Sequence, residues 1–121
     1  MRNDWSLYIA AVPLLSGKSA FRIGRTRNIS ATVKALSEGS PIPVSQISVI
    51  RVGSNRFALA AEAKLLKILA GYSRHGAWIR LDTSSEIDKR CMSAAMRAVS
   101  DLIVSVENNQ TSGWKTLACM Q

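Results

Sequence analysis

The alternation of apolar and polar residues predicts two strands at the start of the chain. Apolar residues recur from Leu7 to Val12, and the run ends at Pro13, which is typical of a strand closed by a turn. Residues 20–24 alternate apolar side chains with Arg22, which favours a second strand with one solvated face. The connecting loop is too short for a crossover helix, so we expect an antiparallel hairpin.

Helical periodicity follows in three later segments, at residues 29–37, 56–70 and 84–106. A stretch rich in Val and Ile at 44–52 predicts a buried strand between the first two helices, and 78–81 predicts a short strand before the last. Cap residues support two helix starts: Asn28 for the first, and a capping box of Thr83 with Glu86 for the third. The apolar face predicted for the third helix comprises Ile87, Cys91, Ala94, Ala98 and Leu102, and it is widened by Val99, Ile103 and Val106.

The order of these elements predicts an α+β fold. A small mixed or antiparallel three-stranded sheet, with β-β-α-β-α order, would be flanked by helices and extended by a long C-terminal helix. We expect residues 1–81 to form the core and residues 82–121 a helical extension and tail of the same single domain. Residues 111–121 are predicted to be a loosely packed tail.

The distribution of charge indicates the kind of binding partner, although it says little about the fold. The 121 residues carry a net charge of +8. Residues 1–80 hold twelve basic and three acidic side chains, a net +9, while residues 81–121 hold four and five, a net −1. An anionic partner is therefore expected at the first two thirds of the chain. Two cysteines cannot build a disulfide framework or a zinc site, which favours the reducing cytoplasm, and no apolar run approaches membrane-spanning length.

Five short segments stand in a distinctive order between residues 7 and 81: LYIA, FRIGRT, SEGSPIPV, AEAKLL and HGAWIRL. Their order and spacing resemble the GIY-YIG endonuclease superfamily, and most closely its phage-type branch, in which a basic residue precedes IGRT. The resemblance covers residues 6–81 and implies a nuclease, a hydrolase that cleaves the phosphodiester bonds of DNA with a divalent metal, Mg²⁺ or Mn²⁺. A hard cation of this kind prefers oxygen ligands and keeps several waters, so a single carboxylate can suffice.

The resemblance also implies roles for individual residues. Tyr8 matches the tyrosine that works near the attacking water, and Glu62 matches the helix carboxylate that binds the metal. Arg22 and Arg25 match basic positions of the second motif that hold the phosphate, and these four residues form the implied catalytic set. Gly24 matches a glycine expected to let a ligand approach the strand closely. The wider set expected to bind nucleic acid is Lys18, Arg22, Arg25, Arg27, Arg51 and Arg56.

Besides departures at Ser6, Ala77 and Ile79, two positions depart from the family pattern where the loss bears on catalysis. Thr32 stands where the family carries an arginine, and Leu66 stands where the branch often carries a histidine. Both key residues also have a purely structural interpretation. Tyr8 would be a half-buried tyrosine of a strand, and Glu62 would be a surface carboxylate paired with an Arg or Lys one helical turn away. Two alternatives to the nuclease therefore stay open. One is a DNA-binding module of the same fold without catalysis. The other is a small basic adaptor whose C-terminal helix packs against a partner or a second copy.

Overall fold

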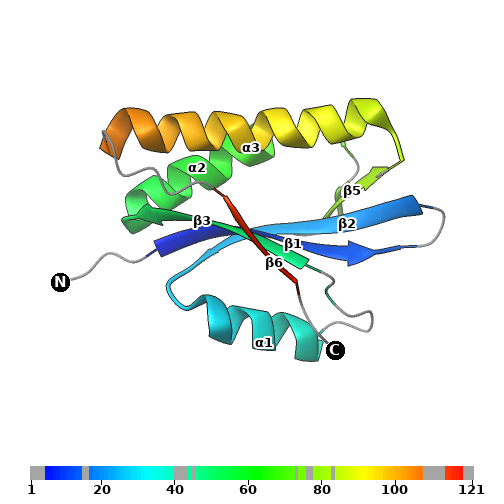
Figure 1. Ribbon diagram of the computed structural model, residues 1–121, viewed down its shortest axis with the longest axis horizontal. Coiled ribbons are helices and arrows are strands. Elements are labelled where there is room, and N and C mark those ends of the chain that lie inside the picture. The colour runs from blue at the N-terminus through cyan, green and yellow to red at the C-terminus, as the bar shows by residue number, and fades with distance from the viewer. Residues whose placement is uncertain are drawn as a thin grey trace.

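A computed structural model of the chain describes residues 5–14, 17–39, 44, 46–72, 74–75, 78–82, 84–107 and 114–118. Its centre is one antiparallel sheet of six strands in the order β4-β5-β2-β1-β3-β6 (Figure 1). The strands are β1 (Trp5–Pro13), β2 (Lys18–Thr26), β3 (Gln46–Gly53), β4 (Arg74–His75), β5 (Trp78–Asp82) and β6 (Lys115–Ala118). The helices are α1 (Ile29–Gly39), α2 (Asn55–Ile68) and α3 (Glu86–Glu107).

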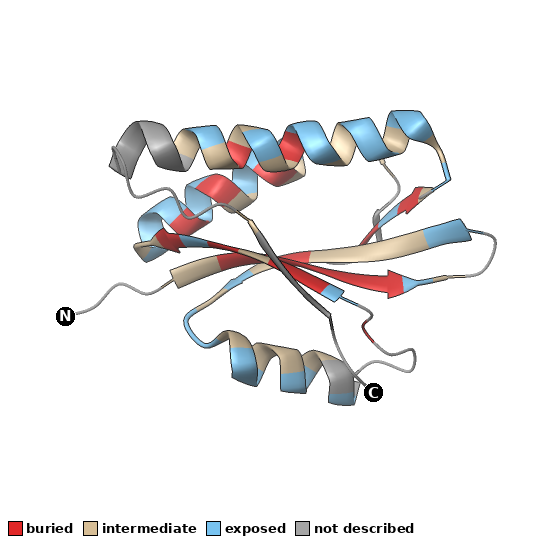
Figure 2. Cartoon of the chain, viewed as in Figure 1, coloured by how far each residue is buried: buried red, intermediate tan, exposed pale blue. Residues whose placement is uncertain are grey.

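Helices cover the sheet from both sides. Figure 1 shows α2 and α3 stacked on one face and α1 on the other. The larger core cluster lies under α2 and α3 and includes Leu7 and Ile9. The smaller cluster lies against α1 and includes Tyr8 and Ala10. Because successive strand residues point to opposite faces, this alternation along β1 separates the two cores, and Figure 2 shows the resulting buried layers. We call the two sides the two-helix face and the α1 face.

The register of β2 decides which face each of its residues occupies. Directly opposed residues of an antiparallel pair share a face. Tyr8 is opposite Gly24, and Ala10 is opposite Arg22, so Arg22 and Gly24 lie on the α1 face. Leu7 is opposite Arg25, which therefore lies on the two-helix face.

Polar caps explain where the helices begin. The Asn28 side chain accepts a hydrogen bond from the Ala31 amide at 3.1 Å, as its predicted cap role requires. The Ser54 hydroxyl accepts from the Phe57 amide and caps α2. At α3, the Ser85 hydroxyl accepts from the amide of the third helical residue at 3.3 Å. Thr83 of the predicted capping box lies outside the described residues.

The α+β class, the antiparallel sheet and the long C-terminal helix are confirmed. Three further strands, β4, β5 and β6, extend the predicted three-stranded core, and only β5 falls on a segment expected to be extended. The prediction of a loose tail over residues 111–121 is wrong for Lys115–Ala118, which form β6 and pair with β3, while residues 111–113 and 119–121 lie outside the described residues. None of the described helices has the length and apolar character needed to cross a membrane.

The apolar face predicted for α3 is confirmed only in part. Val99 is fully buried and Cys91 packs against the larger core cluster, as predicted. The fully buried Ala95 was missed, whereas Ile87 is 77% exposed and Ala94 is exposed. Met92 and Met96, absent from the predicted stripe, pack against the core. Flexible Met side chains fill such gaps well, so leaving them out of the pattern rotated the predicted face around the helix.

Candidate nucleic-acid interface

Four exposed arginines gather at one end of the sheet. Arg25 lies near the end of β2 and Arg27 directly after it, Arg51 lies near the end of β3, and Arg56 lies in the first turn of α2. Ser6 pairs with Thr26 on one side and with Arg51 on the other, which brings the ends of β2 and β3 to the start of β1. We call the side chains of this group the strand-end cluster: Arg25, Arg27, Arg51 and Arg56.

Two helices begin at the same end of the sheet. The first, α1, starts three residues after the end of β2, and α2 starts two residues after the end of β3. Neither helix has an acidic residue in its first turn. The amino end of a helix carries a partial positive charge and favours anions. The helix ends therefore add to the positive field of the strand-end cluster.

An acidic side chain, Glu62, contacts the cluster through Arg25. The Arg25 Nη1 donates to Glu62 Oε1 at 2.7 Å, and the Arg25 Nε donates to Asn55 Oδ1 at 3.1 Å. The two side chains of the ion pair are 34% and 20% exposed, respectively. Solvent therefore screens the pair, and a partly exposed pair of this kind contributes at most ~1 kcal/mol to stability.

Sequence reasoning missed the role of Asn55. Asn55 and Glu62 are seven residues apart, which is close to two turns of helix and places them on one face of α2. The guanidinium of Arg25 thus lies between two oxygen acceptors from the same helix. The seven-residue spacing of two oxygen-bearing side chains was the available signal.

Tyr8 lies on the other face of the sheet. Its side chain is 6% exposed and belongs to the core cluster that packs against α1. A Cβ built at Gly24 would lie 2.6 Å from the Tyr8 hydroxyl oxygen. The space above Gly24, which we expected to admit a ligand, is therefore filled by the Tyr8 ring. Arg25 and Glu62 come together on the two-helix face, and Tyr8 lies apart from them.

The two positions that depart from the family pattern have structural roles. The Thr32 hydroxyl lies 2.7 Å from the Thr26 hydroxyl, which also accepts from the Asn28 amide. These hydrogen bonds join α1 to the end of β2. Leu66 packs against the larger core cluster. At both positions the side chain supports the fold.

The remaining basic residues predicted to bind nucleic acid lie on the α1 face of β2. The guanidinium carbon of Arg22 lies 6.0 Å from the ring centroid of Trp78, a cation–π distance. Lys18 is opposite Asp82 on β5, and its charge contributes to lowering the pKa of that carboxyl. In the strand-end cluster, Arg27 makes a similar contact with Trp5 at 5.9 Å. The predicted set therefore divides into two surfaces.

The fold and this distribution of charge define a small α+β protein with an arginine-rich end that suits an anionic ligand. A family model, the T5orf172 domain, matches residues 6–98. The chain therefore belongs to the T5orf172 domain family, a phage-associated domain of nuclease type. No curated protein and no solved structure matches the chain.

The expected assignment to the GIY-YIG superfamily is wrong, because the family model that matches is the T5orf172 domain and no GIY-YIG match accompanies it. The motif residues that suggested it have local structural roles here: Gly24 makes room for Tyr8, and Thr26 joins β2 to α1. Membership of the T5orf172 family supports a nucleic-acid-related role. Within the residues described, no three His, Cys, Asp or Glu side chains form a group that could hold a metal ion.

Proposed function

We propose that this protein binds DNA through the strand-end cluster. The observation that carries the proposal is that four exposed arginines lie at the end of the sheet where two helices begin, with Arg25 on the two-helix face and Arg51, opposite Ser6, on the α1 face. Neither helix has an acidic residue in its first turn. Guanidinium groups match phosphate oxygens in shape and keep their charge at every physiological pH. The ring of Trp5 orients Arg27 without neutralising its charge.

Electrostatic binding of this kind makes a measurable prediction. Each phosphate neutralised on duplex DNA contributes about −0.9 to the slope of log affinity against log salt concentration. Four arginine contacts would give a slope near −3.6, and removal of two would bring it to about −1.8. Arg27 and Arg56 are the two members to remove, because Arg25 is shared with Glu62.

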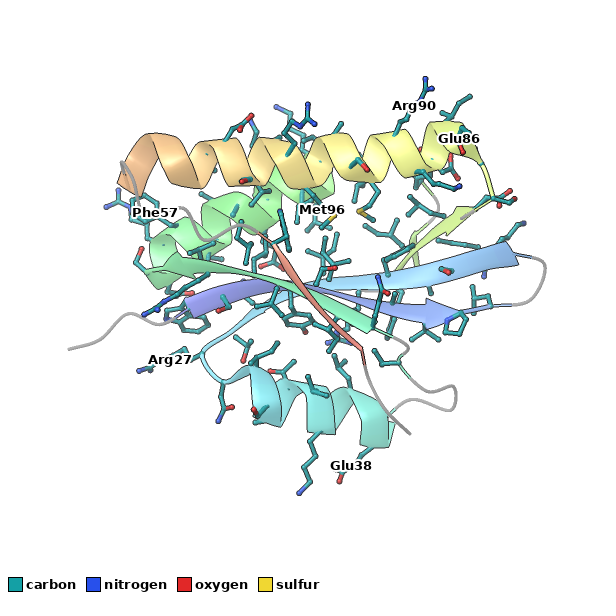
Figure 3. All side chains as sticks on the ribbon, in the orientation of Figure 1. Arg27, Glu38, Phe57, Glu86, Arg90 and Met96 are labelled. Atoms are coloured by element: carbon teal, nitrogen blue, oxygen red, sulfur yellow. The ribbon has the colours of Figure 1, made fainter. Side chains whose placement is uncertain are left out.

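The test is fluorescence anisotropy of a labelled 20-base-pair duplex over a salt series. The double variant Arg27→Ala, Arg56→Ala should weaken binding at least tenfold and halve the slope. The matched control is Arg90→Ala with Arg97→Ala, which removes two exposed charges from α3. Figure 3 shows Arg90 pointing away from the sheet. Equal losses in the two double variants, or no DNA affinity in the native chain at low salt, would contradict the proposal; the second result would favour the adaptor.

A second candidate function is metal-dependent phosphodiester hydrolysis at Glu62. The carboxylate of Glu62 and the amide oxygen of Asn55 are hard oxygen donors that meet at one guanidinium, and they fit Mg²⁺ or Mn²⁺ in donor chemistry. A bound metal would neutralise charge on the phosphate and activate a water. Arg25 would then turn from these oxygens to a phosphate oxygen. Tyr8 has no part in this proposal, because its ring is packed on the α1 face.

Plasmid nicking in Mg²⁺ or Mn²⁺ tests this second function. Glu62→Gln should abolish nicking and leave duplex affinity within about twofold, because the Arg25 contact carries little free energy. Glu38→Gln is the matched control, since it removes one exposed carboxylate from α1 (Figure 3). DNA binding without nicking by the native chain would select the module that binds without catalysis. Assembly of two copies through α3 stays a prediction that these assays do not address.

A further inference from the structure

We propose that a second surface, on the α1 face of β2 and β5, binds a single-stranded nucleic-acid segment. We call it the β2–β5 strip, and its residues are Lys18, Ala20, Arg22, Trp78, Arg80 and Asp82. The inference deepens the proposed function, on which it rests, by naming the form of the substrate: DNA in which a duplex adjoins a single strand. Arg80 and Trp78 have no role in the binding set predicted from the motifs.

Strand register brings the six residues together. Lys18 is opposite Asp82, Ala20 is opposite Arg80, and Arg22 is opposite Trp78. Opposed residues share a face, and neighbouring strands lie about 4.8 Å apart, so the six side chains form two adjacent rows. The residues between them, including Ile79 and Leu81, point into the two-helix core.

In the part of the chain that the structure describes, the strip is partly open to solvent. The apolar residues of α1 pack with Tyr8, Ala10, Val12, Val44 and Ile47, which belong to β1, to β3 and to the chain before β3. Figure 1 shows β2 and β5 running past the end of α1. Lys18 and Arg80 are exposed, and Arg22 and Trp78 are half-buried. Among the described helices, none covers this part of the sheet.

The chemistry of the strip suits a single strand better than a duplex. Three basic side chains face one acid, and Asp82 already accepts two hydrogen bonds from Ser84. Residues two apart on a strand are about 6.7 Å apart, which is close to the phosphate spacing of an extended single strand. The Arg22 guanidinium lies over the Trp78 ring, so the outer plane of the guanidinium offers a stacking surface with the ring beneath it, and the small side chain of Ala20 leaves room beside the pair. Bases of a duplex are already stacked and cannot use such a platform.

The strip and the strand-end cluster lie at different places on the molecule, so variants can separate them. The test uses anisotropy with a labelled 12-nucleotide oligo(dT) and a labelled 20-base-pair duplex. Lys18→Ala with Arg80→Ala should weaken oligo(dT) binding about tenfold and leave duplex affinity within about twofold. Arg27→Ala with Arg56→Ala should weaken duplex binding at least tenfold and leave oligo(dT) affinity within about twofold. The control, Arg90→Ala with Arg97→Ala, should change neither.

A second variant tests the stacking platform. Trp78→Leu keeps apolar bulk against the smaller core cluster and removes the aromatic ring. It should weaken oligo(dT) binding about tenfold with native circular dichroism. Oligo(dT) affinity unchanged in both strip variants, or lost in parallel with duplex affinity, would overturn the inference. If the native chain binds oligo(dT) but not the duplex, the proposal for the strand-end cluster is refuted, and the inference about the β2–β5 strip is supported.

Discussion

Replacement of Gly24 by alanine tests how closely β1 and β2 are built around the Tyr8 ring. An added Cβ would lie 2.6 Å from the Tyr8 hydroxyl oxygen, 2.7 Å from Cζ and 2.9 Å from Cε2. Ordinary contacts between such atoms are about 3.5 Å or longer. Tyr8 is 6% exposed and packs in a core cluster, so the ring cannot retreat without moving its neighbours.

The expected loss follows from two opposing terms. Overpacking of a buried site costs about 1–3 kcal/mol. Alanine also restricts the unfolded chain more than glycine does, which returns about 0.4–1 kcal/mol. We therefore expect Gly24→Ala to lower the free energy of unfolding by about 1–2 kcal/mol.

A double-mutant cycle identifies the cause. In a Tyr8→Leu background the shorter side chain removes all three close contacts, so Gly24→Ala should cost nothing there. In a Tyr8→Phe background two of the three contacts stay, and the cost should persist. The free energy of unfolding of each variant is measured by urea denaturation. The coupling energy between Gly24→Ala and Tyr8→Leu should therefore equal the loss in the native background, about 1–2 kcal/mol. Additive losses would refute the reasoning, and so would a neutral Gly24→Ala in the native background.

Three further predictions concern stability. Ser54→Ala removes the cap that accepts from the Phe57 amide and should cost about 1 kcal/mol by urea denaturation, while Ser54→Gly should cost only a few tenths. Leu65→Ala empties a fully buried core position and should cost about 2–5 kcal/mol; a loss below 1 kcal/mol would contradict the core described. Hydrogen bonds from Ser84, and then the charge of Lys18, lower the pKa of Asp82. The ionised carboxylate therefore stabilises the fold fully above the ordinary Asp pKa of about 3.9, and this stabilisation is lost as the pH falls through the lower pKa of the folded state. Asp82→Asn removes this contribution, so the melting temperature of the variant should fall less steeply with decreasing pH.

Local pattern predicted most of the fold. The bounds of all three helices fall within two residues of those expected from periodicity, because the apolar spacing and the caps act within a few turns. The two-residue strand β4 and the four-residue strand β6 were missed. Such short pairings depend on what lies opposite them, so their own residues carry little signal.

The site was harder to predict than the fold, because register controls it. The pairing of Leu7 with Arg25 places Tyr8 opposite Gly24, and a shift of one residue would reverse every face. Motif matching brings Tyr8 and Arg25 into one group without regard to that alternation. The contact between Arg25 and Glu62 joins residues 37 apart in the chain, and only the tertiary structure supplies it.

Strand β6 covers an edge of the sheet that could otherwise pair with a second copy of the protein. The T5orf172 match ends at residue 98, so β6 lies beyond it. The indole N–H of Trp114, the residue before β6, donates to the Met96 carbonyl of α3 at 2.9 Å. Strand β6 occupies the outer hydrogen-bonding groups of β3, a strand rich in Val and Ile. Unpaired strands of that composition invite addition of a strand from another molecule. In a chain shortened before β6, we expect the outer edge of β3 to be exposed and to favour strand pairing between two copies.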